Sequence, residues 1–512
     1  MKCSIRSAFV VFTGLFAAAC AFAQGQQVAQ KRTNILFFLV DDMGWQDCSL
    51  AMHTERTKLN DRYQTPNLEK LATMGTVFTQ AYTASVCSPS RTSLMTGQNA
   101  ARHGITSWTL YKDKAAENGR VINGVHPPAW PVNGLCPDAT VKRSVVCTQT
   151  LPRLLSDAGY HCIHVGKAHW GAQETSGADP LNFGFAVNIG GHCAGGPGSY
   201  HGEKNYSGRW RNAETVWDVP GLDRYHGTDT YLTEALTLEA MAALDCNEKS
   251  GKPFYLYMSH YAVHAPFEAD PRYVSKYRER GLSDHDATYA SMLEGMDKSL
   301  GDLMAWLERN HHLDDTLVIF MSDNGSPREN ARNLPLRGHK VTGYEGGTRV
   351  PFVIRLPRQL KAGRKVLARQ DAPIIIEDVY PSLLDVAGVP WRKIVKHTVD
   401  GQSFMPLVLE GSKGDSKREF IWHYPNTYDI GPWSSIRLGD WKLICHYAER
   451  KLELYNLKED IGESRNILSS NREIAKDLAM RLGSQLKARK AFMPQDSKGK
   501  TVGYPEDFLG TR

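Results

Sequence analysis

Four oxygen-bearing side chains stand directly after two apolar stretches of the sequence: Asp41, Asp42, Asp323 and Asn324. Adjacent carboxylates at the tip of a buried strand repel one another and lose hydration, and a divalent cation relieves both costs. Because all four ligands are oxygens, the pattern predicts Ca2+, with Mg2+ as the second choice, over zinc or copper. One such pair alone is more often a turn or a helix cap. Two pairs, each at the end of a strand, favour the metal site.

A candidate nucleophile lies in the segment from Cys87 to Gly97. Pro89 is typical of a helix start and Gly97 of a helix end, so the segment predicts a helix with Cys87 just before its N-terminus. The helix dipole favours negative charge there, and Arg91 lies one turn further on. The pattern indicates a nucleophilic cysteine beside an anion site. The alternative is a buried structural cysteine next to a capped helix.

Strands and helices must alternate to position these residues. Continuous apolar runs, typical of strands buried on both faces, lie at 35–40, 162–165, 254–259 and 316–321. Helical segments lie at 151–158, 231–244 and 289–308. Polar residues follow each strand: Asp41-Asp42, Lys167 with His169, His260 with His264, and Asp323-Asn324. The alternation predicts an α/β fold with a large, mostly parallel sheet between helices, and a ligand site beyond the carboxyl ends of the strands.

The C-terminal part has a different pattern. Short strands joined by tight turns are predicted at 420–424, 435–438, 442–447 and 452–456, with a final helix at 475–488. This indicates a small antiparallel sheet with one helix. We therefore expect a signal peptide at residues 1–23, a catalytic α/β domain at 24–415 and a C-terminal subdomain at 416–512.

The N-terminus has the three zones of an export signal. Lys2 and Arg6 give a positive start, residues 8–19 form an apolar stretch too short to span a bilayer comfortably, and Ala21-Phe22-Ala23 is a small-x-small cleavage site. The alternatives are a short buried helix and, because of Cys20, a lipoprotein signal. That signal would lack the large aliphatic residue usual three positions before the cysteine. The pattern predicts cleavage after residue 23 and a periplasmic or secreted protein.

The composition excludes several classes of protein. With 41% hydrophobic and 23% charged residues, the chain has enough apolar surface for a large core, which excludes general disorder. The net charge of +6 is spread along the chain without a long basic run, so no nucleic-acid partner is expected. No segment after the signal is apolar enough to predict a membrane span.

Eight of the ten cysteines follow the predicted signal. In an oxidising compartment some of them are expected to pair. Cys136 and Cys147 flank a short loop and are the first expected disulfide. The spacings lack the two-residue separation of a zinc knuckle.

The segment Cys87-x-Pro89-Ser90-Arg91, followed by Thr96-Gly97, resembles the signature of the type I sulfatases in the alkaline phosphatase superfamily. The resemblance covers nearly the whole mature chain. The other matching segments are residues 34–36, 41–44, 166–169, 264–266, 322–325 and 344–349, together with Lys340. Residues 439–443 and 453–457 are similar to the family's C-terminal subdomain. His339 departs from the small residue expected before Lys340. The implied fold is alkaline phosphatase-like.

The resemblance implies the identity of the nucleophile and of the metal site. Cys87 is expected to be oxidised after translation to Cα-formylglycine by a maturating enzyme, and the hydrated aldehyde is expected to attack sulfur. Arg91 is expected to steady the modified side chain. The implied calcium ligands are Asp41, Asp42, Asp323 and Asn324.

Two lysines and two histidines complete the implied site. Lys167 and Lys340 are expected to bind the sulfate group. His264, which is chosen over His260 because a proline follows two residues later, is expected to protonate the departing alcohol. His169 is expected to assist the later release of sulfate.

The implied activity is hydrolysis of O-sulfate esters. Export and loops rich in His and Trp favour sulfated sugars of mucin, glycosaminoglycan or algal glycans as substrates, with a lean toward galactose-type sugars. We expect exo action on them. His192, in a glycine-rich stretch, is the first candidate for recognising the substrate. Trp108, Trp170 and Trp433 are candidates for stacking on sugars, although packing is the more common role of such residues.

Two other functions fit the same sequence. One is a phosphatase or phosphodiesterase of the same superfamily, although those enzymes typically use Ser or Thr as nucleophile and often bind two metals. The other is a catalytically silent binder of sulfated glycans, which would keep the fold with an unmodified Cys87.

Overall fold

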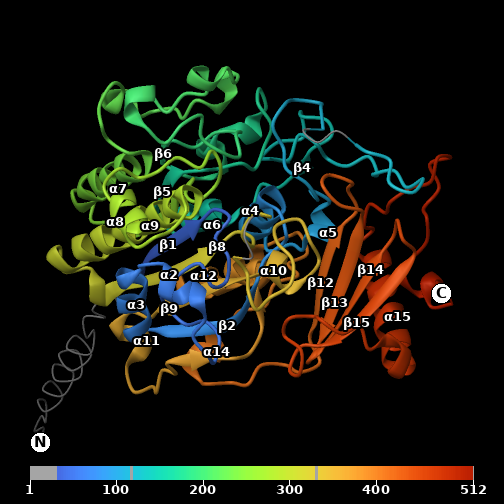
Figure 1. The fold of residues 1–512 in the computed structure, drawn as a ribbon. Helices are drawn as coiled ribbons and strands as arrows, with labels where there is room; N and C mark the ends of the chain where they lie inside the picture. Colours follow the sequence, from blue (N-terminus) through green and yellow to red (C-terminus); the bar gives the residue numbers. More distant parts are fainter. Residues whose placement is uncertain (1–31, 116–118, 329–331, 511–512) are drawn as a thin grey trace, which may run out of the picture. The chain divides into compact units, whose positions relative to one another are not determined.

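The apolar run at 35–40 forms the predicted strand β1 (Asn34–Val40), which is buried along its whole length. The computed structural model describes residues 32–115, 119–328 and 332–510, so the predicted signal peptide lies outside the described residues. β1 belongs to a nine-stranded sheet in the order β10-β2-β9-β8-β1-β7-β5-β6, with β11 beside β2 (Figure 1).

Seven of the other strands lie parallel to β1 in this sheet. β9 (Arg349–Arg355) is the exception, because it runs antiparallel to both β8 and β2. The remaining strands are β2 (Thr76–Tyr82), β5 (His161–Gly166), β6 (Val187–Ile189), β7 (Phe254–Ser259), β8 (Thr316–Ser322), β10 (Arg369–Gln370) and β11 (Ile374–Ile375). The predicted large, mostly parallel sheet is confirmed.

Helices cover both faces of the sheet (Figure 1). Side chains of β1 alternate between two cores: Leu36 and Phe38 enter one, and Phe37 and Leu39 enter the other. The first core also contains residues of α3 (Pro66–Thr73), α7 (Leu232–Glu248), α8 (Val274–Glu279) and α9 (Asp284–Arg309). The second contains residues of α4 (Cys87–Thr96), α6 (Leu151–Asp157) and α12 (Val379–Val386). This burial on two faces explains the uninterrupted apolar runs of the central strands.

The C-terminal strands form the predicted antiparallel sheet, in the order β12-β13-β14-β15. Their bounds are Glu419–Tyr424, Trp433–Leu438, Trp441–His446 and Lys451–Asn456. α15 (Arg472–Ala488) packs its apolar side on this sheet, where Leu478 and Leu482 meet Ile436 and Leu443 in a separate core. The boundary at residue 415 stays a prediction.

Short elements connect these parts. The short helices are α2 (Lys58–Arg62), α5 (Ala100–His103), α10 (Glu345–Thr348), α11 (Arg358–Lys361), α13 (Trp391–Ile394) and α14 (Met405–Leu409). A small ribbon pairs β3 (Leu135–Cys136) with β4 (Val145–Val146). Within the described ranges, no helix combines the length and apolar character that a membrane span requires.

The expected disulfide between Cys136 and Cys147 is wrong. All eight cysteines in the part of the chain that the structure describes are free. Cys136 lies opposite Val146 in the β3–β4 ribbon, so Cys147 comes one residue later. Since successive side chains of an extended segment point to opposite faces, the two thiols face away from one another.

Candidate functional site

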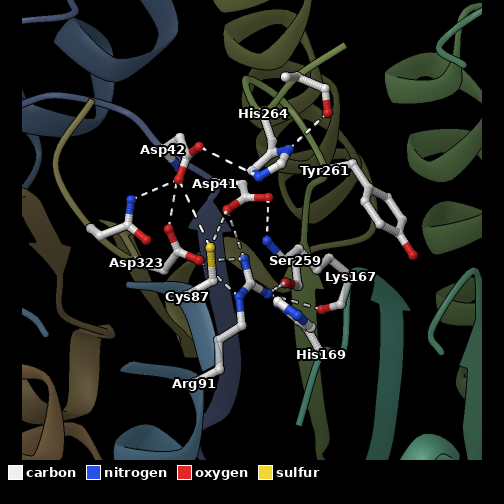
Figure 2. A network of polar contacts seen from close by, with 12 residues as sticks. Asp41, Asp42, Cys87, Arg91, Lys167, His169, Ser259, Tyr261, His264 and Asp323 are labelled. Atoms are coloured by element: carbon white, nitrogen blue, oxygen red, sulfur yellow. Dashed lines mark hydrogen bonds and ion pairs between the residues drawn. The ribbon is translucent and has the colours of Figure 1, made fainter. Parts of the chain in front are cut away.

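The carboxyl ends of β1, β5, β7 and β8 bring the predicted polar residues together. Asp41 and Asp42 follow β1, and Asp323 and Asn324 follow β8, the neighbouring parallel strand. Figure 2 shows the three aspartates converging with Cys87, Lys167 and His264 in one network. The convergence follows from parallel strands whose carboxyl ends meet at one edge of a sheet.

Three carboxylates and one thiol form a compact group. One ligand atom from each of Asp41, Asp42, Cys87 and Asp323 lies within 4.8 Å of the others. Burial and the neighbouring Asp323 raise the pKa of Asp41 well above its usual range. Burial also opposes ionisation of Asp42, but Lys340 and His264 outweigh it and hold the pKa of Asp42 below its usual range. The group thus gathers acceptors whose mutual repulsion must be offset by cations.

Two lysines supply part of that positive charge. The Lys167 ammonium lies 2.6 Å from Oδ2 of Asp41. The Lys340 ammonium lies 2.7 and 2.9 Å from the two carboxylate oxygens of Asp42, and 3.2 Å from Sγ of Cys87. Both lysines that the sequence assigns to sulfate binding therefore lie at the floor of the site.

Arg91 holds the ends of several strands in place. Its Nε donates to Oδ2 of Asp323 at 2.8 Å, and one terminal nitrogen donates to the carbonyl of Lys167 and to Oγ of Ser259. A second terminal nitrogen lies 3.6 Å from Oδ1 of Asp41. Arg91 is completely buried, and we assign it the positioning of the carboxylates. Ser259, the last residue of β7, is a part of this arrangement that the sequence did not single out.

Cys87 is the first residue of α4, one position later in the helix than the sequence predicted. Its sulfur lies 3.7 Å from Oδ1 of Asp41 and 3.9 Å from Oδ1 of Asp42. Burial outweighs the two lysines and raises the pKa of the Cys87 thiol to about 12, so the thiol is protonated at neutral pH.

Two histidines flank the group, each with one ring nitrogen engaged. His264 donates from Nδ1 to the carbonyl of Ala265 at 2.7 Å, which leaves Nε2 facing the site, 3.6 Å from Oδ2 of Asp42. Burial lowers the pKa of His264 to about 3. His169 donates from Nε2 to the carbonyl of Thr109 at 2.9 Å, and its buried Nδ1 has no hydrogen-bond partner.

A cavity of about 210 Å³ opens above this floor. Five residues that the sequence singled out line it: Cys87, Trp108, His169, His264 and Lys340. Its remaining lining consists of Val86, Gly195, Trp217, Val341 and Tyr428. Trp217 and Tyr428 were missed because irregular loops give no periodic signal that would mark them.

The structure places the side chain of His192 outside the cavity. His192 packs beside the ring of Tyr261, with centroids 6.3 Å apart. Its backbone carbonyl accepts a hydrogen bond from the amide of His169 at 3.1 Å, so it supports the site through the main chain. Trp170 and Trp433 are buried packing residues, whereas Trp108 is partly exposed in the cavity.

The donor set fits a hard divalent cation. The side-chain oxygen of Asn324 is buried without a hydrogen-bond partner, close to carboxylates from β1 and β8. Carboxylate and amide oxygens are the ligands that calcium prefers. Because Arg91, Lys167 and Lys340 already balance three carboxylates, a bound cation would leave the floor electropositive. Such a floor suits an anionic substrate.

The comparisons with known proteins identify the family. The sequence profile described as Sulfatase matches residues 33–389. The chain belongs to the sulfatase family. It is therefore a sulfuric ester hydrolase. The profile described as N-sulphoglucosamine sulphohydrolase, C-terminal, matches residues 339–491.

Relatives of this sulfatase cover most of its length. A protein named Sulfatase from Formosa agariphila is 29% identical and covers 94% of this chain and 93% of its own. Human N-acetylgalactosamine-6-sulfatase is 29% identical over 76% of this chain and 68% of its own. A crystal structure of Ps i-CgsB in complex with k-i-k-neocarrahexaose superposes with a TM-score of 0.71 at 22% identity, covering 93% and 96% of the two chains. That last likeness shows the fold.

Proposed function

We propose that this sulfatase is an exo-acting hydrolase of O-sulfate esters on carbohydrates of mucin, glycosaminoglycan or algal type. The observation that carries the proposal is the position of Cys87. Its sulfur lies 3.2 Å from the Lys340 ammonium and within 4 Å of two aspartates, at the floor of an open cavity. This arrangement places one reactive side chain where an anionic ester would be held by cations.

Cys87 would be converted to Cα-formylglycine by a maturating enzyme. The hydrated aldehyde supplies an oxygen nucleophile and a route for releasing sulfate, which a protonated thiol lacks. The start of α4 holds this side chain toward Asp41 and Asp42. Arg91 keeps the neighbouring carboxylates in place from below.

Asp41, Asp42, Asp323 and Asn324 would hold Ca2+, with Mg2+ as the weaker candidate. When bound, the ion supplies positive charge that stabilises charge developing on the sulfate oxygens. Lys167, which pairs with Asp41, and Lys340, which pairs with Asp42, would both bind the same sulfate group. Cations around the sulfate offset its repulsion of an approaching nucleophile.

The histidines would move protons. His264 has Nε2 directed at the site and would hold the proton for the departing alcohol oxygen, a role worth about 10²–10⁴-fold in rate. The negative charge of a bound sulfate favours the protonated ring, which the empty pocket disfavours. His169, with an unpartnered Nδ1 at the cavity wall, would accept a proton during release of sulfate.

Carbohydrate substrates are supported by the relatives and by the predicted export. Human N-acetylgalactosamine-6-sulfatase is named for a sulfated sugar, and Ps i-CgsB was crystallised with k-i-k-neocarrahexaose. A signal peptide at residues 1–23 would place this enzyme in the periplasm or outside the cell, where sulfated glycans occur.

Peptide mass analysis of residue 87, combined with a sulfate-release screen on defined sulfated sugars, tests the proposal. We expect the aldehyde at Cys87 and release of sulfate from at least one sugar. An enzyme that carries the aldehyde, spares every sulfated sugar and cuts phosphodiesters would instead be the phosphodiesterase alternative. An unmodified Cys87 in the native host, with sugar binding but no turnover, would indicate the silent binder.

A further inference from the structure

The walls of the cavity differ in chemistry from its floor. The floor contains the charged and polar groups assigned to sulfate. The walls consist of Val86, Trp108, Gly195, Trp217, Val341 and Tyr428. In the described part of the chain, no arginine, aspartate or glutamate side chain lines this cavity. The alcohol part of the substrate would therefore meet a surface that is almost entirely apolar.

Three aromatic rings from separate segments make up most of these walls. Trp108 follows α5, Trp217 ends a 3₁₀ helix (Thr215–Trp217), and Tyr428 lies in the loop between β12 and β13. The rings of Trp108 and Tyr428 meet at a centroid distance of 6.1 Å with planes 73° apart. Edge-to-face contact of this kind fixes ring orientation.

The two tryptophans are also held by apolar packing. Both pack against one small apolar cluster that contains Leu110 and Val216. A ring held by packing loses little side-chain entropy when a ligand stacks on it. The aromatic walls are thus pre-organised.

The charges of the site are all engaged at the floor. Lys167 is completely buried against Asp41, and Lys340 lies against Asp42. A second sulfate or a carboxylate elsewhere on the sugar would be placed against apolar walls without a cation. Burying an unpaired charge costs several kcal/mol in practice, which disfavours such sugars.

We infer that this cavity selects a neutral hexopyranose that carries a single sulfate. The C–H face of the sugar stacks on Trp108 and Trp217, and sugars with a second sulfate or a uronate carboxylate on the same ring are rejected. This inference rests on the proposed carbohydrate sulfatase activity and specifies its substrate class.

The kinetic test compares Trp108→Ala and Trp217→Ala with Trp210→Ala. Trp210 is an exposed tryptophan in the same region and does not line the cavity. On the best monosulfated galactose or N-acetylgalactosamine regioisomer, the first two variants should raise KM about 10-fold, the equivalent of ~1.4 kcal/mol of stacking. The Trp210→Ala variant should match the wild type. The Trp210→Ala variant should also retain the wild-type kcat on a small aryl sulfate, which reports the chemistry at the floor.

A binding test separates the inference from the proposed reaction. In a Cys87→Ala background, calorimetry should show the monosulfate binding at least about 10-fold more tightly than the matching 4,6-disulfate. The inference is overturned if the disulfate or a sulfated uronate binds better, or if the Trp108 and Trp217 variants match Trp210→Ala on every sugar. Failure of the aldehyde-bearing enzyme to cleave any sulfate ester would instead contradict the proposed function, and the calorimetry would still decide the selectivity.

Discussion

Of two buried charge clusters in the described part of the chain, one has the features of a reactive site and the other does not. The site cluster joins Asp41, Asp42 and Asp323 with Lys167 and Arg91 at the sheet edge. The second, which we call the junction cluster, consists of Tyr82, Glu345, Arg349, Arg437, Lys442 and Glu463 between the main sheet and the C-terminal sheet.

The junction cluster is buried, and its carboxylates are paired with cations. The Lys442 ammonium lies 2.9 Å from a carboxylate oxygen of Glu345 and 2.9 Å from one of Glu463. The hydroxyl of Tyr82 donates to Glu345 at 2.6 Å. Despite burial, Lys442 and Arg349 lower the pKa of Glu345 to about 2. This cluster fastens β14 to the segment that follows Lys340.

The site cluster is open by contrast. It borders a cavity, it contains a thiol, and the Asn324 oxygen has no partner. Buried charge alone therefore does not mark a functional site. A site is marked by like charges that converge around an unsatisfied acceptor and an open space.

Replacing Cys87 with Ala should abolish turnover, with kcat reduced by at least about 10⁴-fold because the nucleophile is lost. The free energy of unfolding should change by less than about 1 kcal/mol, since only one sulfur atom is removed. Steady-state kinetics and urea unfolding measure the two effects. Cys445→Ala, in the core of the C-terminal sheet, is the control and should keep kcat. Unchanged turnover in the Cys87→Ala variant would show that Cys87 does not provide the nucleophile.

Lys442→Met should have the opposite profile, a loss of stability of about 3–5 kcal/mol, because two buried carboxylates lose their shared cation. Equilibrium unfolding at neutral pH measures this change. Lys451→Met, in the same sheet, removes a half-exposed lysine that pairs with Glu453, and it should cost less than about 1 kcal/mol. Equal losses in both variants would show that the junction cluster contributes no special stability.

Glu377 is a buried carboxylate outside both clusters, and its charge is poorly compensated. Burial and the neighbouring Asp378 raise the pKa of Glu377 to about 8, while Asn99 donates a hydrogen bond to it at 2.8 Å. Because the folded pKa lies above the unfolded value, the stability that this group contributes is full below about pH 4.5 and is lost as pH rises toward 8.

Glu377→Gln, which mimics the protonated acid, should therefore stabilise the protein above pH 8 by on the order of 2–4 kcal/mol and have little effect at pH 4.5. Thermal or denaturant unfolding across this pH range measures the difference between the two proteins. A constant difference at all pH values would contradict the assigned titration.

Trp433 links the C-terminal sheet to the site, and its loss should have the smallest effect. Its indole donates to the carbonyl of Val341 at 2.8 Å. Val341 has φ of 79°, a left-handed conformation that costs a β-branched residue about 1–3 kcal/mol. The restraint keeps the adjacent Lys340 at the floor.

Trp433→Phe should lower kcat/KM about 10-fold through displacement of Lys340, the rate equivalent of one lost hydrogen bond. Val341→Gly accepts the same φ without strain and should restore part of the loss in the double variant. Purely additive effects of the two changes would show that the indole acts on stability alone.

The sequence predicted those parts of the site that follow buried parallel strands. The apolar runs of β1, β5, β7 and β8 are unambiguous, and parallel strands must bring their carboxyl ends together. Asp41, Lys167 and Asp323 could therefore be placed at one edge before the structure was known. The sequence also predicted the antiparallel C-terminal sheet from its short strands and turns.

The rest depends on tertiary contacts that leave no local signal. Glu345 and Lys442 lie in segments that resemble the family, but no local pattern indicates their ion pair, which forms only when the two sheets pack together. Trp217 and Tyr428 reach the cavity from loops without periodicity. The Cys136–Cys147 disulfide was wrongly predicted for the same reason. The register of β3 and β4, which the sequence does not give, decides which way the two cysteines point.

The most direct test of the difference between the clusters is the calcium content of the purified protein. Metal analysis after dialysis at known free Ca2+ should find one ion per chain in the wild type and in Glu345→Gln. It should find none in Asp42→Asn or Asn324→Ala when circular dichroism shows these variants folded. A folded wild type without bound ion, or ion binding that survives in the Asp42 and Asn324 variants, would contradict the account.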